Sequence, residues 1–137
     1  MCDIISVTWR QLPEALINQS GLSAFRRGSG DLEYHFSFKQ RSPCLPVWTE
    51  GQLSILPWAG YCPRESLDAG CWSERQPESV EIVATLCCDK GIWFTVNEGI
   101  RGVLVARRVY VITAPASHYY RIMTRHDRMP VLIGESI

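Results

Sequence analysis

Residues 80–113 read VEIVATLCCDKGIWFTVNEGIRGVLVARRVYVIT, and this stretch decides the fold. Four runs within it are rich in β-branched and aromatic side chains, which are typical of strands: residues 80–86, 92–96, 102–105 and 109–113. We expect Arg107-Arg108 to form the turn between the last two runs. The stretch therefore predicts several consecutive strands.

A further strand is predicted just upstream, because apolar and polar residues alternate over residues 32–39. A period of two is typical of a strand with one buried face, so Tyr34 and Phe36 are expected to point inward and Glu33 and His35 outward. Residues 4–9 also read as a strand. Residues 46–49 and 53–56 resemble a hairpin with its turn at Glu50-Gly51.

Helices are expected to be few and short. Pro13 stands at a helix-starting position and predicts a helix over residues 12–17, and Ser117 is a suitable cap for one or two helical turns over residues 117–124. Residues 20–31 and 59–78 read as loops, the second long enough to carry function. The chain is thus predicted to be a single strand-rich α+β domain over residues 1–137, with a curled or barrel-like mixed sheet.

The composition narrows the class of protein. At 137 residues, 46% hydrophobic and 20% charged, the chain is sized for one domain with a real core. It contains no run approaching the roughly 20 apolar residues of a membrane helix, and Met1-Cys2-Asp3 begins no signal peptide. We therefore expect a cytoplasmic protein without a membrane partner. The six cysteines are expected to be reduced, and because no Cys-x-x-Cys pair occurs, no metal or cofactor is expected.

Charge is unevenly distributed although the formal net charge is zero. Residues 101–128 contain six arginines and only one acid, Asp127. Arginine grips phosphate through two hydrogen bonds and stacks on bases, which indicates nucleic acid as a candidate partner. The alternative is that these arginines simply form a solvated face, since a neutral domain lacks the strongly basic balance of most nucleic-acid binders.

Cys2 follows the initiator methionine, whose removal would make it the N-terminal residue. An N-terminal cysteine combines an α-amine, with a reference pKa of about 7.7 to 8.0, and a thiol, with a reference pKa of about 8.5. The amine can attack an aldehyde to give a Schiff base, and the thiol can then close on the same carbon to form a five-membered thiazolidine. A second-position cysteine can also be an accident of sequence.

The C-terminal end contains Thr113-Ala114-Pro115-Ala116-Ser117 and, after it, Arg125-His126-Asp127-Arg128-Met129-Pro130 with apolar residues behind. Together with Met1-Cys2, these motifs resemble the SOS-response-associated peptidase family. Two looser matches lie between them: the strand before Trp58-Ala59-Gly60, and Gly91-Ile92-Trp93-Phe94.

The resemblance implies a strand-rich α+β protein of the DNA damage response that binds single-stranded DNA. Such a protein captures the aldehyde of an abasic site as a DNA-protein crosslink, and the family has a proposed self-processing peptidase chemistry at Met1-Cys2. Cys2 would be the nucleophile and His126 the acid/base, a task that suits an imidazole near neutral pH. The predicted DNA contacts are Arg64, Arg121, Arg125, Arg128 and Trp58.

The chain departs from the family pattern at one catalytic position. The family places a glutamate after its paired aromatics, and Phe94 stands there in this sequence. Two other interpretations therefore stay open. One is a non-catalytic nucleic-acid-binding module that uses arginines and exposed tryptophans. The other is a thiol hydrolase with Cys2 and His126 as nucleophile and base, for which no orienting third group is evident.

Overall fold

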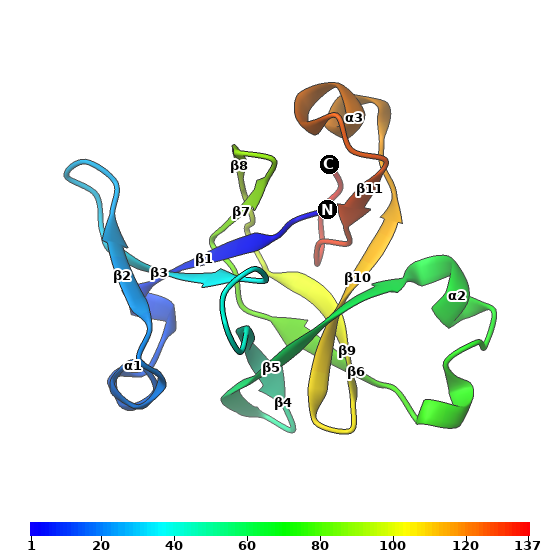
Figure 1. The fold of residues 1–137 in the computed structure, drawn as a ribbon, viewed down its shortest axis with the longest axis horizontal. Helices are drawn as coiled ribbons and strands as arrows, with labels where there is room; N and C mark the ends of the chain where they lie inside the picture. Colours follow the sequence, from blue (N-terminus) through cyan, green and yellow to red (C-terminus); the bar gives the residue numbers. More distant parts are fainter.

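The computed structural model describes all residues from Met1 to Ile137 and contains two β-sheets with short helices at the periphery (Figure 1). The first sheet has five antiparallel strands in the order β2-β3-β1-β7-β8. Their bounds are β1 (Ile4–Thr8), β2 (Ser23–Arg26), β3 (Leu32–Ser37), β7 (Leu86–Asp89) and β8 (Ile92–Thr95).

The second sheet has six strands in the order β11-β10-β5-β4-β6-β9, and an additional pairing between β10 and β9 closes five of them into a barrel. The barrel is mixed, because β10 runs parallel to β5 while its other pairs are antiparallel. The predicted strand-rich α+β fold with a barrel-like mixed sheet is confirmed. The bounds are β4 (Cys44–Thr49), β5 (Gln52–Pro63), β6 (Glu78–Ile82), β9 (Ile100–Val105), β10 (Arg108–Pro115) and β11 (Arg128–Pro130).

Both sheets contribute to one hydrophobic core, a cluster of 21 buried residues. Ile5 and Val7 enter it from β1 of the first sheet, and Val47 and Val111 enter it from the barrel. The sheets are also joined through the backbone, since Val83 donates to the carbonyl of Pro46 and Thr85 to that of Ser6. Residues 83–85 therefore carry the chain from the barrel into the first sheet.

The helices are short: α1 (Glu14–Ser20), α2 (Arg64–Asp68) and α3 (His118–Thr124), with 3₁₀ turns η1 (Trp9–Gln11) and η2 (Ser73–Arg75). Ser117 caps α3 as expected, because its hydroxyl accepts a hydrogen bond from the backbone N–H of Tyr120. Arg125 ends α3 in the left-handed conformation, with φ of 59°, and turns the chain back toward β11. None of these helices has the length and apolar character needed to cross a membrane.

Three predicted boundaries were wrong. Residues 20–31 contain β2, an edge strand whose four residues are all exposed, so no buried face marks it in the sequence. Residues 59–78 begin inside β5 and continue into α2 and η2 rather than forming a loop. The run 80–86 is not one strand, because β6 ends at Ile82 and the chain crosses to the other sheet before β7 begins.

The alternation of residues 32–39 predicted one face of β3 correctly and the other incorrectly. Tyr34 and Phe36 are buried as expected. Glu33, expected to face outward, is 4% exposed and accepts contacts from Arg27 at 3.0 Å and His35 at 2.9 Å. Burial by itself raises the pKa of Glu33, but the hydrogen bond from His35 and the charge of Arg27 more than offset that effect, so its pKa lies below the usual value. These partners make a buried carboxylate tolerable.

Candidate functional site

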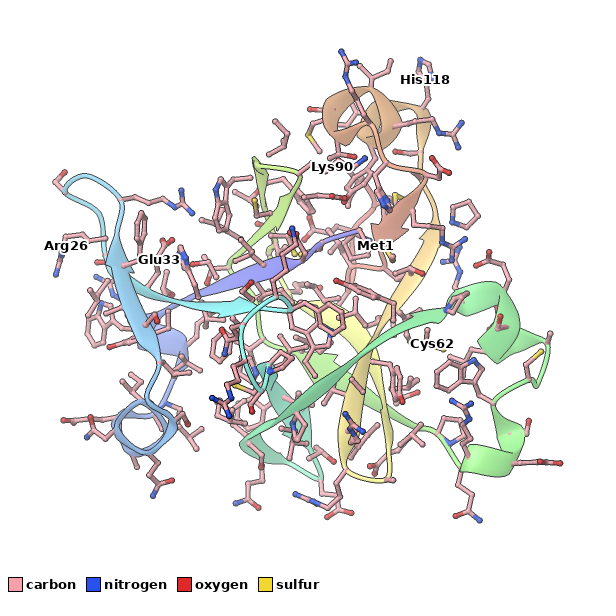
Figure 2. The ribbon with its side chains drawn as sticks, viewed as in Figure 1. Met1, Arg26, Glu33, Cys62, Lys90 and His118 are labelled. Atoms are coloured by element: carbon pink, nitrogen blue, oxygen red, sulfur yellow. The ribbon has the colours of Figure 1, made fainter.

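The two ends of the chain meet at the α-amino group of Met1. Its nitrogen lies 2.7 Å from Nδ1 of His126 and 2.8 Å from Oδ2 of Asp89. Strand β1 carries the amino terminus to this point, and β7 and the segment between α3 and β11 carry its two partners (Figures 1 and 2). An amine, an imidazole and a carboxylate are thereby gathered from positions 1, 89 and 126.

Backbone contacts fix the first residues of the chain. The N–H of Asp3 donates to the carbonyl of Cys88 at 3.1 Å, and the hydroxyl of Tyr61 donates to the carbonyl of Cys2 at 2.7 Å. Burial raises the pKa of the Tyr61 phenol, which therefore remains a hydrogen-bond donor at any physiological pH. Both bonds hold the peptide group between Cys2 and Asp3, so the path of the chain is set directly after Cys2.

Cys2 itself lies under the amino terminus, with 1% of its surface exposed. Its thiol donates to the carbonyl of Ile4 at 3.2 Å. The predicted nucleophile therefore adjoins the site through its own backbone, while the direct contact with His126 is made by the amine of Met1. In this form of the chain the thiol is covered.

Asp89 is the residue of the site that the sequence analysis missed. Its carboxylate is buried, with a side-chain exposure of 2%, and it accepts a hydrogen bond of 2.5 Å from the hydroxyl of Tyr120 in addition to the contact with the amine. A buried carboxylate is stable only with such partners. Burial and the bond to Asp89 both raise the pKa of Tyr120. The available signal was a lone acid ending the apolar run Leu86-Cys87-Cys88, just before the turn at Lys90-Gly91.

Phe94, which stands where the resemblance implies a glutamate, is close to this site. Its ring packs edge-on against Tyr120 with a centroid distance of 5.7 Å. Phe94 sits on β8 opposite Cys87 of β7, two residues from Asp89 along that strand. The site's acid therefore comes from the neighbouring strand, and the aromatic ring supports the tyrosine that binds it.

His126 is held so that Nδ1 faces the amine. The backbone N–H of His126 donates to Oγ1 of Thr124 at 3.2 Å, and the N–H of Arg128 donates to Nδ1 at 3.2 Å. Nδ1 also lies 3.1 Å from the carbonyl oxygen of Arg128, but two donors, the amine and the Arg128 N–H, face it. These two donors match the tautomer with the lone pair on Nδ1 and the ring proton on Nε2. An imidazole with a free Nδ1 lone pair next to an ammonium group is arranged to accept its proton.

The side chain of Arg128 is engaged within the protein. Its guanidinium holds both carboxylate oxygens of Glu65, at 2.6 and 3.0 Å, and also donates to the carbonyl and hydroxyl of Thr113. The bond from Arg128 lowers the pKa of Glu65 to about 2. This fork ties α2 to β10, so a phosphate would have to displace Glu65 to reach Arg128. Arg64, the neighbour of Glu65 at the start of α2, is exposed.

Trp58 requires a correction. Its indole is 2% exposed, packs against Phe38 and Tyr61 at centroid distances of 5.1 and 6.0 Å, and donates to the carbonyl of Gly60. A base cannot stack on a ring without an open face, so Trp58 is a core residue and not a DNA contact. It acts on the site only as packing behind Tyr61, which binds the carbonyl of Cys2.

The arginines of residues 101–128 do not form one face. Arg121 and Arg125 are exposed on α3, beside the site, where Lys90 donates to the carbonyl of Arg125 at 3.1 Å. Arg107 and Arg108 lie at the turn between β9 and β10, at the opposite end of that hairpin from α3 (Figure 1). The cations next to the amine are therefore Lys90, Arg121 and Arg125.

All six cysteines are free thiols. Burial, and then the hydrogen bond between its thiol and that of Cys2, raise the pKa of Cys87, while burial raises the pKa of Cys62 to about 11. No group of three or more His, Cys, Asp or Glu side chains converges to hold a metal ion. The chemistry available at the amino terminus is thus that of an amine, a thiol, an imidazole and a carboxylate.

The comparisons with known proteins add no relative: no family model, no curated protein and no solved structure matches the chain.

Proposed function

We propose that the chain, once Met1 has been removed, captures the aldehyde of an abasic site in single-stranded DNA through the N-terminal amine and thiol of Cys2. The observation that carries the proposal is the contact of the N-terminal amine with both Nδ1 of His126 and Oδ2 of Asp89. A free amine at neutral pH is mostly protonated and must lose a proton before it can attack. A base and an anion at the amine are what such an attack needs.

Removal of Met1 makes room for the substrate. The new amine belongs to Cys2, and consecutive Cα atoms are about 3.8 Å apart, so the nitrogen retreats from His126 and Asp89 by roughly one residue. The volume that Met1 occupied then lies between the amine and the two side chains. The sugar aldehyde would occupy that volume, within reach of all three groups.

The reaction then follows from these groups. His126 Nδ1 takes a proton from the ammonium group through one bridging water, and the neutral amine adds to the aldehyde carbon to give a carbinolamine. The imidazolium returns the proton to the hydroxyl, which leaves as water, and an iminium forms. His126, neutral again, takes the proton of the Cys2 thiol as the sulfur adds to the iminium carbon and closes the five-membered ring. This leaves a neutral ring nitrogen, and the proton on His126 passes to solvent. The carboxylate of Asp89 stabilises the cationic intermediates.

The DNA strand is expected to lie across the face of α3 next to the amine. Arg121, Arg125 and Lys90 carry positive charge there, and Arg64 is exposed at the start of α2. Phosphate contacts of this kind position a strand without reading its sequence. Arg128 is the weaker candidate, because Glu65 already occupies its guanidinium fork.

Incubation of the Met1-free protein with single-stranded DNA containing one abasic site tests the proposal. We expect a band on denaturing gels that survives heat without a reducing agent. Cys2→Ser should abolish that band but still give a Schiff base that borohydride traps, because the amine remains while ring closure is lost. His126→Gln should slow formation of the band roughly 10²-fold or more, the usual contribution of an acid/base group. Salt-sensitive binding without any covalent band would instead indicate the non-catalytic module.

A further inference from the structure

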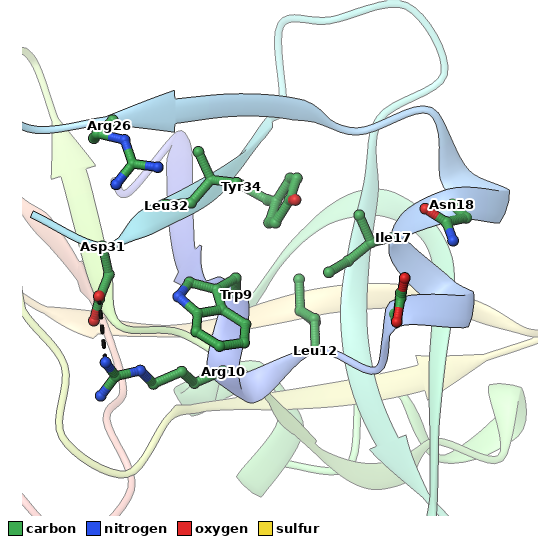
Figure 3. Close-up of a pocket in the computed structure, with 10 residues that line it drawn as sticks. Trp9, Arg10, Leu12, Ile17, Asn18, Arg26, Asp31, Leu32 and Tyr34 are labelled. Carbon is green, nitrogen blue, oxygen red and sulfur yellow. Dashed lines mark hydrogen bonds and ion pairs between the residues drawn. The ribbon is translucent and has the colours of Figure 1, made fainter.

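A second site lies at the other end of β1 from the amine. It is a pocket of about 610 Å³ between η1, α1 and strands β2 and β3 (Figure 3). Strand geometry places Trp9 roughly 23 Å from Cys2, at about 3.3 Å per residue. Pockets that bind small molecules usually measure about 300 to 1,000 Å³. The proposed capture chemistry uses no residue of this pocket.

The wall of the pocket is an unpartnered indole. Trp9 is 46% exposed and packs against no other aromatic ring of the chain; its one ring contact of note is the guanidinium of Arg10, 5.7 Å from its centroid. Leu12, Leu32 and Tyr34 continue the apolar wall beside it. An indole left open in a pocket offers a flat surface on which a planar ring can stack.

One end of the pocket is charged and contains both signs. Arg10 and Arg26 stand there together with Asp31, which accepts from Arg10 at a long distance of 3.4 Å (Figure 3). Nη1 of Arg26 donates a hydrogen bond to the carbonyl of Gly30 at 3.0 Å. This bond orients the guanidinium group and leaves its other nitrogens free to donate to a ligand. Two arginines suit a phosphate, and a carboxylate beside them suits the hydroxyl groups of a sugar.

We infer from the juxtaposition of the open Trp9 indole with Arg10, Arg26 and Asp31 that this pocket binds a nucleotide. The base stacks on Trp9, the phosphate lies between the two guanidinium groups, and a sugar hydroxyl donates to Asp31. Asn18 and Glu14, which line the pocket from α1, supply amide and carboxylate groups for the edge of the base. A simple anion or a purely apolar ligand would leave one half of this lining unpaired.

Isothermal titration of the protein with adenosine monophosphate at low salt, alongside adenosine and inorganic phosphate, tests the inference. The nucleotide should bind with one-to-one stoichiometry and at least about tenfold more tightly than either part, because both ends of the pocket contribute. Trp9→Ala should weaken binding roughly 5- to 150-fold, the usual range for loss of one stacked base. Trp48→Ala, a variant of an equally exposed tryptophan at 45% on the barrel, is the matched control and should leave binding unchanged.

Arg26→Gln should weaken binding of the nucleotide and not of adenosine, whereas Arg107→Gln in the distant hairpin turn should change neither.

A short oligoadenylate distinguishes the two sources of such a ligand, a free nucleotide and one unit of an unpaired nucleic-acid strand. If the oligoadenylate binds as tightly as the nucleotide or more tightly, and Trp9→Ala weakens both to the same extent, the pocket takes one unit of an unpaired strand. If only the free nucleotide binds, the ligand is a soluble nucleotide. Cys2→Ser must retain nucleotide binding, which separates this site from the capture reaction. Absence of saturable binding, or equal losses in Trp9→Ala and Trp48→Ala, overturns the inference.

Discussion

Oδ2 of Asp89 lies 2.8 Å from the α-amino nitrogen of Met1, so the carboxylate at the end of β7 is the counter-ion of the amino terminus. Asp89 is also the acceptor for the hydroxyl of Tyr120. One buried oxygen therefore connects the start of the chain to α3. The pair explains how a charged carboxylate persists with a side-chain exposure of 2%.

Replacement of Asp89 by asparagine removes this charge while keeping the shape of the side chain. We expect the free energy of unfolding to fall by about 1–3 kcal/mol, because a hydrogen bond to a charged group is lost in a buried place. Chemical denaturation of Asp89→Asn would measure the loss. Asp3→Asn is the control, since the carboxylate of Asp3 pairs with the exposed Lys39 at 3.4 Å and loss of its charge should cost less than about 1 kcal/mol. Equal losses in the two variants would contradict the role assigned to Asp89.

Thiol labelling should report the burial of Cys2. With iodoacetamide at pH 8, the exposed Cys71 should react first. Burial raises the pKa of Cys62 to about 11, so only about one part in a thousand of this thiol is thiolate at pH 8. An ordinary thiol is roughly a quarter thiolate at that pH, so Cys62 should react slowly. Cys2 should be labelled only after Met1 has been removed. Peptide mass spectrometry of the two forms gives the result, and rapid labelling of Cys2 in the Met1-bearing chain would show that the thiol is not covered.

The pair between Arg128 and Glu65 should be visible in a carboxyl titration by NMR. Glu65 is expected to titrate near pH 2 and to move toward 4.5 in Arg128→Gln. Because the folded-state pKa is depressed, the stability that this pair contributes is fully present above about pH 4.5 and is lost as pH falls toward 2. Arg64→Gln is the matched control, since Arg64 makes no hydrogen bond to Glu65 and lowers its pKa through charge alone. A Glu65 pKa that does not respond to Arg128→Gln would mean that the fork does not form in solution.

Binding to single-stranded DNA should weaken as salt rises. Each phosphate contact contributes about 0.7 to the slope of log K against log salt for a single strand, so Arg121→Gln with Arg125→Gln should reduce that slope by roughly 1.4. The pair Arg107→Gln with Arg108→Gln removes the same charge from the far end of the barrel and should leave it nearly unchanged. Fluorescence anisotropy measures both slopes. If the two double variants reduce the slope equally, the strand lies elsewhere or responds only to net charge.

Much of the architecture could be predicted because strands leave a periodic signal. The runs at 4–9, 92–96, 102–105 and 109–113 all became strands, and the cap at Ser117 was read from its chemistry. The edge strand β2 gave no signal, because none of its residues is buried and its position depends on pairing with β3. The break after Ile82 was invisible for the opposite reason: Val80 and Cys87 are both buried, although in different sheets.

The candidate site was predictable in part. Cys2 and His126 were selected by position and motif, and the structure places His126 against the amino terminus. Asp89 was missed because its role depends on the register of β7 with β8 and β1, a long-range property that no local pattern encodes. Trp58 was misassigned because sequence alone does not distinguish a core indole from an exposed one. Trp9, at 46% exposure, is the open ring that Trp58 was expected to be.

The meeting of residue 1 with residue 126 has a consequence for the order of events during synthesis. A nascent chain presents its amino terminus to processing enzymes long before His126 has left the ribosome. In the finished fold the amine of Met1 is held by His126 and Asp89, and the next peptide group, between Cys2 and Asp3, is anchored by Tyr61. An enzyme that trims Met1 therefore has its best access while the chain is still growing. The amino terminus is exposed first, and its contact with His126 forms only when the last tenth of the chain has been made.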